Sequence, residues 1–255
     1  MTALITGGSS GMGLEYARQL AGRGYSLILV SNREDELSEA SAQLEAAFPV
    51  SVTTRFQDLA QPSSADELFA WCTEQLGILP DILVNNAGMF FFKELSEDDL
   101  PRVQAMVNLH VVTVTRLSLL FGLAMKKRGS GYILNMSSMT AEIPAPGITV
   151  YSATKTYLKS FGRSLSYELK PYGVGVTTVC PAAIATPLYH LGEKRMKTLL
   201  RLGLIHTPSW LVRRALRAMF HRRRVINPGF MNVWLPALIW LLPGPLVAAI
   251  WKKLK

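Results

Sequence analysis

Short apolar runs alternate with longer helical patterns through the first two-thirds of the chain, and this alternation limits the possible folds more than any other feature. Continuous apolar, β-branched runs are typical of strands covered on both faces, and strands that alternate with helices form parallel sheets. The sequence therefore predicts an α/β fold, a doubly wound parallel sheet of about seven strands with a helical C-terminal extension. The expected strands are Ala3–Thr6, Ser26–Ser31, Ser51–Phe56, Ile82–Asn85, Tyr132–Met136, Val174–Val179 and Arg224–Ile226, and the expected helices lie near 12–23, 34–47, 63–76, 98–127 and 150–170.

A glycine-rich turn at residues 6–13 (TGGSSGMG) joins the first expected strand to the first expected helix. Glycine lets the backbone turn tightly and lets a pyrophosphate approach the helix N-terminus, whose N–H groups and dipole attract anions. The spacing is Gly-x3-Gly-x-Gly, unlike the general G-x-G-x-x-G fingerprint, and a glycine turn also occurs as a plain connection. In this βαβ setting we expect a dinucleotide site of the Rossmann type.

The end of the second expected strand indicates which dinucleotide binds. An acidic residue about 20 positions after the glycine turn hydrogen-bonds the ribose of NAD. Here the neutral Asn32 and the cationic Arg33 occupy that region. A planar guanidinium can hold a 2′-phosphate with two hydrogen bonds, whereas the alternative is that Arg33 only begins a surface helix. We expect NADP(H) rather than NAD(H).

Tyr151 and Lys155 lie four residues apart in a helical pattern, so their side chains share one face. An ammonium near a phenol stabilises the phenolate and lowers its pKa, which makes tyrosine a usable proton donor or acceptor. Such a pair is common on helices, but here Ser138 precedes it at the end of a strand, where active sites of parallel sheets lie. The three residues are therefore candidates for general acid–base catalysis at a carbonyl oxygen.

Taken in order, these motifs resemble the short-chain dehydrogenase/reductase family between Thr6 and Thr186. The basic, apolar C-terminal end resembles, by composition alone, the branch of 17β-hydroxysteroid dehydrogenases and long-chain 3-oxoacyl reductases. The motifs that carry the family resemblance are the glycine turn, Asp58-Leu59 after the third strand, Asn85-Asn86-Ala87-Gly88 after the fourth, Asn108 in a long helix, Ser138, Tyr151-x3-Lys155 and Pro181-x4-Thr186.

The resemblance implies a hydride transfer with Tyr151 as the general acid in reduction. Lys155 would hold the nicotinamide ribose and tune Tyr151, Ser138 would polarise the carbonyl, and Asn108 would support a water that leads protons toward Lys155. Asp58 would contact the adenine. The residues expected to bind the cofactor are Gly7, Ser9, Ser10, Gly11, Met12, Gly13, Asn32, Arg33, Asp58, Leu59, Asn85, Ala87, Gly88, Tyr151, Lys155, Pro181, Ile184 and Thr186.

Two departures from the family pattern stand near the expected cofactor. The family usually has Pro-Gly where this chain has Pro181-Ala182, and a methyl group there could alter the turn beside the nicotinamide. The basic residue common in the glycine turn of NADPH users is replaced by Ser9 and Ser10. His110, in the long helix, is expected to be packed rather than chemically active.

Charge divides the chain. Residues 1–186 hold 14 Lys/Arg and 17 Asp/Glu, whereas residues 187–255 hold 13 Lys/Arg and only Glu193. The basic part is expected to meet a phospholipid surface, a phosphorylated substrate carrier or nucleic acid, or to be a solvated face. Nucleic acid is not expected, because no recognition motif accompanies the arginines.

We expect residues 1–229 to form one dinucleotide-binding and catalytic domain, with a substrate lid at about 187–221. A helix opened by Thr207-Pro208 should place Arg213, Arg217 and Arg224 near one face. The leucine-rich segment 188–204 favours a lipophilic carbonyl or alcohol substrate.

The extension 230–255 is apolar and ends in lysines, with three prolines that disfavour a membrane-spanning helix. Peripheral membrane contact through 210–255 is one interpretation, and packing of this tail on the domain or on a partner subunit is the other.

Cys72 and Cys180 lie far apart in no metal-ligand spacing, so we expect neither a metal site nor a disulfide, and a cytoplasmic location, peripheral on a membrane in the first interpretation of the tail. A first strand directly after Met1 leaves no room for a signal peptide in this sequence. The family resemblance implies a homodimer or homotetramer built on the two long helices. A non-catalytic dinucleotide-binding regulator or membrane scaffold is the alternative function.

Overall fold

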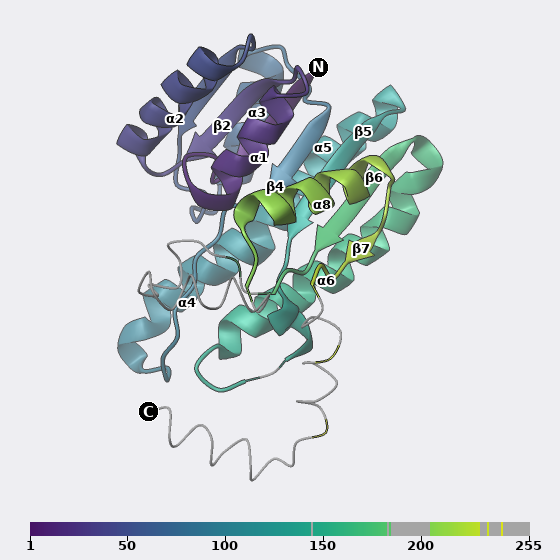
Figure 1. Ribbon diagram of the computed structural model, residues 1–255. Helices are drawn as coiled ribbons and strands as arrows, with labels where there is room; N and C mark the ends of the chain where they lie inside the picture. Colours follow the sequence, from purple (N-terminus) through teal and green to yellow (C-terminus); the bar gives the residue numbers. More distant parts are fainter. Residues whose placement is uncertain (144, 183, 185–204, 230–233, 235–240, 242–255) are drawn as a thin grey trace.

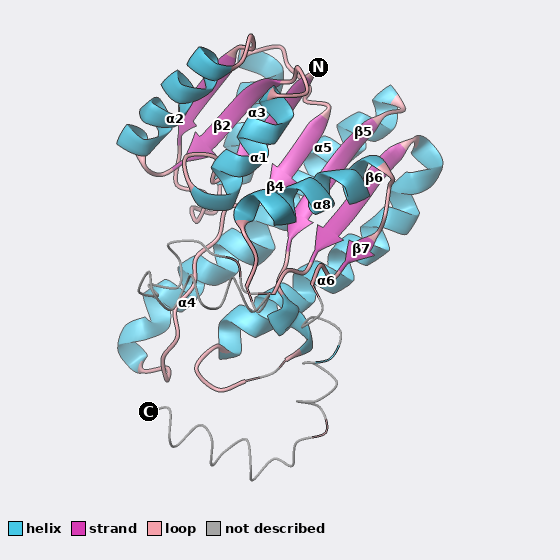
Figure 2. Ribbon diagram, viewed as in Figure 1, coloured by secondary structure: helices cyan, strands magenta, loops and turns pink. Residues whose placement is uncertain are grey.

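The protein is built on one sheet of seven parallel strands in the order β3-β2-β1-β4-β5-β6-β7 (Figures 1 and 2). The computed structural model describes residues 1–143, 145–182, 184, 205–229, 234 and 241. This arrangement confirms the predicted doubly wound α/β fold. The strands are β1 (Thr2–Thr6), β2 (Ser26–Ser31), β3 (Val52–Phe56), β4 (Ile82–Asn85), β5 (Gly131–Met136), β6 (Val174–Val179) and β7 (Val225–Ile226).

Three helices cover one face of the sheet: α1 (Gly11–Ala21), α2 (Glu34–Ala47) and α8 (Pro208–Phe220). The apolar side of α8, which includes Leu211, Ala215 and Met219, is fully buried against α1 and the strands. Residues 208–220 thus form a core helix of the sheet, and the expected role of 187–221 as a substrate lid stays a prediction. Residues 187–204 of that lid, and 230–233, 235–240 and 242–255 of the extension, lie outside the described residues.

The start of α8 follows its sequence signals, whereas its end does not. Thr207 is the N-cap and its Oγ1 accepts a hydrogen bond from the Trp210 N–H, with Pro208 in the first turn. The helix ends at Phe220, and Arg222 adopts a left-handed φ of 53° in the turn that follows. Arg224 therefore lies beyond the helix, where its guanidinium stacks 4.5 Å from the ring centre of Tyr167, and the prediction that it shares the face of Arg213 was wrong.

The other face is covered by α3 (Ser64–Ala70), continued by the π-helical turn η1 (Trp71–Gln75), and by α5 (Val114–Arg128) and α6 (Thr149–Leu169). The helix that ends as α5 begins with η2 (Glu97–Asp99), α4 (Leu100–Val107) and the π-helical segment η3 (Asn108–Thr113). Glu97–Arg128 is long and apolar enough to span a membrane by length and composition. Leu117, Phe121 and Met125 are buried against the sheet, as expected for a core helix of an α/β domain.

Candidate active site

The glycine turn lies between the end of β1 and the start of α1, at the carboxyl edge of the sheet. Gly7 and Gly11 have φ values of 63° and 54°, which glycine adopts without strain. A Cβ on Gly13 would collide with the Gly7 carbonyl, so only glycine fits there. The N-cap Ser10 makes no side-chain hydrogen bond to the first turn of α1, which also carries no acidic residue. The N–H groups of this turn are therefore available to a pyrophosphate, and the site fits a dinucleotide.

The turn after β4 is tied directly to the glycine turn. The Thr6 hydroxyl accepts hydrogen bonds from the N–H groups of Asn86 and Ala87, both at 3.0 Å. The Asn86 amide donates to the carbonyls of Thr6 and Gly7 at 3.1 and 3.2 Å. These four bonds hold Ala87 beside the dinucleotide turn. Thr6 and Asn86 were not among the predicted site residues, although both stand in its motifs.

Asn85 faces away from this groove. Its side chain is 3 % exposed and donates to the Asn135 amide oxygen at 2.8 Å and to the Ser118 hydroxyl at 3.1 Å. It therefore links β4, β5 and α5 inside the domain, so the predicted contact of Asn85 with the cofactor would have to be made by its backbone. The next residues, Ala87 and Gly88, remain at the carboxyl edge.

Arg33 lies where a ribose 2′-phosphate is expected, but it already has a partner. It is the N-cap of α2, and its guanidinium contacts the Glu36 carboxylate at 2.7 Å. Although desolvation alone would raise the pKa of Glu36, hydrogen bonds from Arg33, Ser10 and Ser9 lower it overall. The Ser9 hydroxyl also hydrogen-bonds that of Ser31 at 2.9 Å. Glu36, which sequence reasoning missed, therefore shares the expected phosphate site with Arg33.

Asp58 and Leu59 follow β3 near the same edge. Asp58 is exposed, and its carboxylate accepts hydrogen bonds from the Ala60 N–H and the Gln61 amide. Leu59 is buried, and its carbonyl accepts from the hydroxyls of Ser64 and Thr113. The two residues thus form a fixed turn with Asp58 facing solvent.

Asn108 begins the π-helical segment η3, a feature often found at functional sites. Its amide donates to the Ala60 carbonyl at 3.1 Å, and its oxygen accepts from Gln104 at 2.8 Å. The Asn108 side chain is therefore committed to the turn after β3. Its predicted support of a water stays a prediction.

Lys155 and Tyr151 share one face of α6, as predicted. The Lys155 ammonium lies 5.5 Å from the centre of the Tyr151 ring and donates to the Met136 carbonyl at 3.0 Å. Lys155 is 6 % exposed, and burial lowers its pKa to about 8. The positive charge is thus held beside the phenol in a poorly solvated place, where its effect on the phenolate is strong.

Ser138 is positioned by bonds on either side of it. The Ser137 hydroxyl donates to the Lys155 carbonyl at 2.7 Å, and the Met139 N–H donates to the Pro181 carbonyl at 2.8 Å. Among the described residues, the Ser138 hydroxyl accepts a single 3.2 Å bond, from the Thr140 N–H, and the residue is 7 % exposed. It therefore keeps a proton to donate at the carboxyl edge of β5.

His110 is the feature of the site that sequence reasoning underestimated. It is fully buried, as expected, but its Nε2 accepts the Met89 N–H at 3.0 Å and its Nδ1 lies 3.0 Å from the Thr154 hydroxyl. Thr154 in turn donates to the Tyr151 carbonyl at 2.8 Å, so His110 must donate from Nδ1. Burial, together with the nearby Lys155 charge, lowers the pKa of His110 well below its ordinary value. We call this chain from Met89 to Tyr151 the His110 relay.

The Tyr151 ring is packed from two sides. Phe90 meets it edge-on at 4.9 Å between ring centres, and His110 at 5.8 Å. A Cβ on Gly88 would lie 3.1 Å from His110 Nε2, so this glycine allows the histidine to approach the turn after β4. Helix α6 and the turn after β4 are thereby fixed to each other.

Pro181, Ala182 and Ile184 follow β6 at the same edge and are all buried. Ala182 is not among the described residues with positive φ, so alanine in place of glycine brings no backbone strain here. Ile184 pairs with His206 in an isolated parallel bridge. Thr186 lies outside the described residues.

The fold and this arrangement agree with a family assignment from sequence. Residues 1–196 match the family model described as short chain dehydrogenase. The chain belongs to this family and is an oxidoreductase that uses a nicotinamide dinucleotide.

Two relatives show which branch of the family this chain is similar to. The very-long-chain 3-oxoacyl-CoA reductase of Macaca fascicularis is 34% identical over 246 residues, which are 95% of this chain and 75% of that protein. The 17-beta-hydroxysteroid dehydrogenase type 3 of Danio rerio is 31% identical over 192 residues, 73% of this chain and 61% of that protein. The predicted resemblance to this branch is confirmed, and the chain spans about three fifths to three quarters of these relatives.

A solved structure covers nearly the whole chain. The short-chain dehydrogenase from Sphingobium yanoikuyae, in complex with NADPH, has a TM-score of 0.79 and 28% identity, and the match covers 95% of this chain and 96% of that one. The arrangement of strands and helices is therefore that of a dinucleotide-dependent dehydrogenase.

Proposed function

We propose that this protein reduces a ketone to a secondary alcohol on a lipophilic substrate, with NADPH as the cofactor and Tyr151 as the general acid. The observation that carries the proposal is the Lys155 ammonium, buried 5.5 Å from the Tyr151 ring at the carboxyl edge of the sheet. Ser138 lies at the end of β5 on that edge, and the glycine turn opens onto it.

The roles of the residues follow from their positions. Tyr151 gives its proton to the carbonyl oxygen, and Lys155 stabilises the phenolate that remains. Ser138 donates a hydrogen bond to the same oxygen. The nicotinamide, when bound, supplies the hydride. Asn108 would support a proton-conducting water. The residues we assign to the cofactor are Gly7, Ser9, Ser10, Gly11, Met12, Gly13, Asn32, Arg33, Asp58, Leu59, Ala87, Gly88, Tyr151, Lys155, Pro181, Ile184 and Thr186, with Asn85 acting only through the backbone it supports.

The preference for NADP(H) over NAD(H) rests on Asn32 and Arg33 and is supported by the NADPH bound to the Sphingobium relative. The Arg33 side chain is 69% exposed and so is free to turn toward a phosphate. Glu36 opposes this preference, because its carboxylate would repel a 2′-phosphate. The balance between these two side chains sets the selectivity.

A 3-oxoacyl thioester is the substrate class that we favour, because the first of the two relatives acts on such molecules by its name. A steroid ketone is the second candidate, in line with the zebrafish relative. The leucine-rich segment 188–204 supplies apolar residues for either substrate.

We also propose a homodimer or homotetramer through α5 and α6. Val112, Leu119 and Leu123 are exposed on the long helix, and Tyr157 and Tyr167 on α6. Peripheral membrane contact on the cytoplasmic side remains our proposal for the C-terminal part. Helix α8 presents arginines to solvent while its apolar side faces the core, and Trp234 and Leu241 beyond Gly229 are exposed, so lipid insertion would fall to the tail after Gly229.

NADPH oxidation with a panel of 3-oxoacyl thioesters and bulky ketones tests the proposed function. We expect turnover that Tyr151→Phe lowers by about 10²- to 10⁴-fold while NADPH binding, followed by nicotinamide fluorescence, stays within a factor of about three. A protein that binds NADPH but turns over no member of the panel would instead be the non-catalytic regulator or scaffold.

A further inference from the structure

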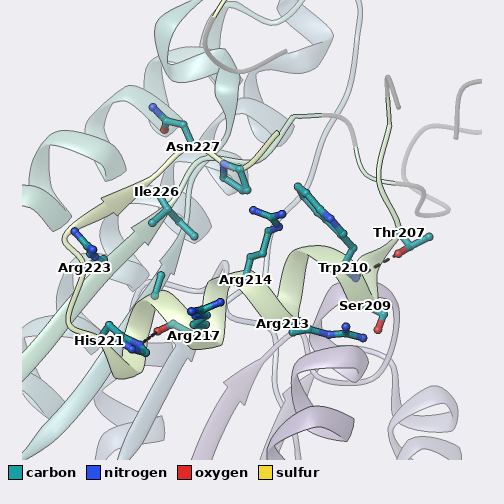
Figure 3. Close-up of a pocket in the computed structure, with 12 residues that line it drawn as sticks. Thr207, Ser209, Trp210, Arg213, Arg214, Arg217, His221, Arg223, Ile226 and Asn227 are labelled. Carbon is teal, nitrogen blue, oxygen red and sulfur yellow. Dashed lines mark hydrogen bonds between the residues drawn. The ribbon is translucent and has the colours of Figure 1, made fainter. Parts of the chain in front are cut away.

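A groove with basic walls runs along α8 (Figure 3). It lies between this helix and the segment Ile226–Pro228, and its volume is about 830 Å³. Arg213, Arg214 and Arg217 line it from α8, and His221 and Arg223 from the turn that follows. We call this hollow the basic groove.

Within the described residues, the arginines of the basic groove have no acidic partner. Within the described part of the chain, Arg33, Arg116 and Arg128 all pair with carboxylates, whereas none of the groove arginines forms an ion pair. No Asp or Glu is among the described residues that line the groove, and the sequence holds none after Glu193. Unpaired guanidinium groups that line a hollow create a positive potential that favours a multiply charged anion.

One wall of the basic groove is rigid. The His206 ring stacks on Trp210 with 3.7 Å between ring centres, and the Arg214 guanidinium lies 4.5 Å from the Trp210 ring centre. Figure 3 shows Trp210 and Arg214 rising from α8 toward the segment Ile226–Pro228. Partial burial, and then the Arg214 charge, lower the pKa of His206. At neutral pH this ring therefore remains an uncharged support for the stack, and the arginines carry the positive charge.

The basic groove reaches the edge of the sheet that holds the active site. His206 pairs with Ile184 just beyond β6, and the Cys180 N–H donates to the Ile226 carbonyl at 2.9 Å. Because β7 is parallel to β6, the segment Ile226–Pro228 leaves the sheet at the edge where Ser138 follows β5. The His221–Arg224 turn lies at the opposite edge, so the groove follows α8, about 20 Å long, away from the catalytic residues.

We propose that the basic groove binds the phosphate groups of a nucleotide-type carrier to which the acyl substrate is joined as a thioester. The inference rests on the proposed function, which places a 3-oxoacyl thioester at Tyr151. A hollow of this volume suits a small phosphorylated molecule, whereas contact with a flat membrane needs no concave site. The carrier phosphates would contact Arg213, Arg214 and Arg217. The acyl chain would lie at the carboxyl edge of the sheet, where the proposed catalytic residues are.

A pair of substrates distinguishes a loss of binding in the basic groove from a loss of chemistry at the active site. The same 3-oxoacyl group is supplied either as the coenzyme A thioester or as the N-acetylcysteamine thioester, which has no phosphate. We expect the double variant Arg213→Gln/Arg217→Gln to lose about tenfold or more in kcat/KM for the first substrate, through KM, because two charge-assisted contacts are removed. Turnover of the N-acetylcysteamine thioester should stay unchanged.

The matched control is Lys127→Gln/Lys170→Gln, which removes two exposed charges from other helices and should alter neither substrate. Equal loss on both substrates, or no loss on either, overturns the proposal. Loss of binding to phosphatidic acid vesicles in the double variant, with the substrate preference intact, would assign the groove to a membrane and equally overturn it.

A binding measurement keeps the groove testable if the proposed function fails. Adenosine 3′,5′-bisphosphate is titrated calorimetrically into protein saturated with NADPH, so that the dinucleotide site is filled. Binding that the groove variant loses and the lysine control keeps supports the phosphate site, even if no thioester is reduced. No binding to the wild-type protein contradicts it.

Discussion

The carboxyl edge of the sheet and the basic groove both carry positive charge. The charge is buried at the edge and exposed in the groove. Lys155 is buried, its Nζ donates to a backbone carbonyl, and its neighbour Tyr151 is packed between Phe90 and His110. The arginines on α8 are exposed, and none of them forms an ion pair within the described residues. A buried charge is little screened and acts strongly on its neighbours, whereas the interactions of exposed charges are screened by water and weakened by salt.

Substitution of His110, in the His110 relay, should have the largest effect among the variants that test this contrast. Removing the ring in His110→Ala leaves the Met89 N–H and the Thr154 hydroxyl buried without their partner, beside a new cavity. We expect a loss of about 3 kcal/mol in the free energy of unfolding and about 10²-fold in kcat. Urea denaturation and steady-state kinetics measure both quantities.

His110→Gln is the matched variant, because its amide oxygen can accept the Met89 N–H. It should restore most of the stability and at least part of kcat. The wild-type protein should also show no step in kcat near pH 6.5, because His110 stays neutral there. Equal kcat in the alanine and glutamine variants, with both folded, would show that the relay does not position Tyr151.

Lys155 gives a pH test of the buried charge. Its pKa is about 8 in the folded protein, against 10.5 for a solvated lysine, so the unfolded chain binds more protons between these values. The folded state is therefore penalised below pH 8, and the penalty disappears as the pH rises through 8 to 10.5. We expect Lys155→Met to be more stable than the wild type at pH 7, by about 2–3 kcal/mol, with the difference shrinking toward pH 10.5.

The same deprotonation should affect catalysis. The value of kcat/KM for the cofactor, which reports on the free enzyme, should fall about tenfold per pH unit above pH 8 as the ammonium is lost. A profile that stays flat to pH 10 would contradict the role given to Lys155.

Arg33 and Glu36 form an exposed ion pair, and its burial is intermediate between that of the two regions. Glu36→Gln removes the carboxylate that holds Arg33 and faces the expected 2′-phosphate. We expect about fivefold tighter NADPH binding, or ~1 kcal/mol, with little change for NADH. Arg33→Gln should weaken NADPH by a similar factor. Fluorescence titrations of both cofactors measure this, and equal shifts for NADPH and NADH would refute the assignment of Arg33 to the phosphate.

A substitution in the turn beside the basic groove should have the smallest effect, which is on stability. Arg222 adopts a φ of 53°, which costs a non-glycine residue about 1 kcal/mol. Arg222→Gly should therefore stabilise the protein by about 0.5 kcal/mol, after the loss of the Arg222–Tyr132 ring contact. Arg223→Gly, at a position without positive φ, serves as the control and should not stabilise. Thermal unfolding of the two variants compares them.

The sequence was sufficient for the sheet because each strand is marked by its own apolar run. Three of the strands both begin and end at the predicted residues: Ser26–Ser31, Ile82–Asn85 and Val174–Val179. The pair Tyr151 and Lys155 was also predictable, because helical spacing alone places them on one face. Lys155 also lies beside the end of β5, where its ammonium donates to the Met136 carbonyl.

Long-range contacts were not predictable in the same way. His110 and Thr154 are 44 residues apart, and no local pattern shows that their side chains meet. Asn85 stands in a motif that points to the cofactor, but alternation along β4 and the nearby amide of Asn135 turn its side chain into the core. The burial of α8 could have been recognised from its apolar positions Leu211, Ala215 and Met219, which repeat at helical spacing.

The central claim is that Tyr151, acidified by Lys155, protonates a ketone oxygen as hydride arrives from the nicotinamide. Incubation with NADPH carrying deuterium at C4 of the ring, and with a 3-oxoacyl thioester, tests it directly. We predict a 3-hydroxyacyl product heavier by one mass unit from the wild-type protein, and almost none from Tyr151→Phe with the same NADPH affinity. Equal deuterium transfer by the two proteins would contradict the account.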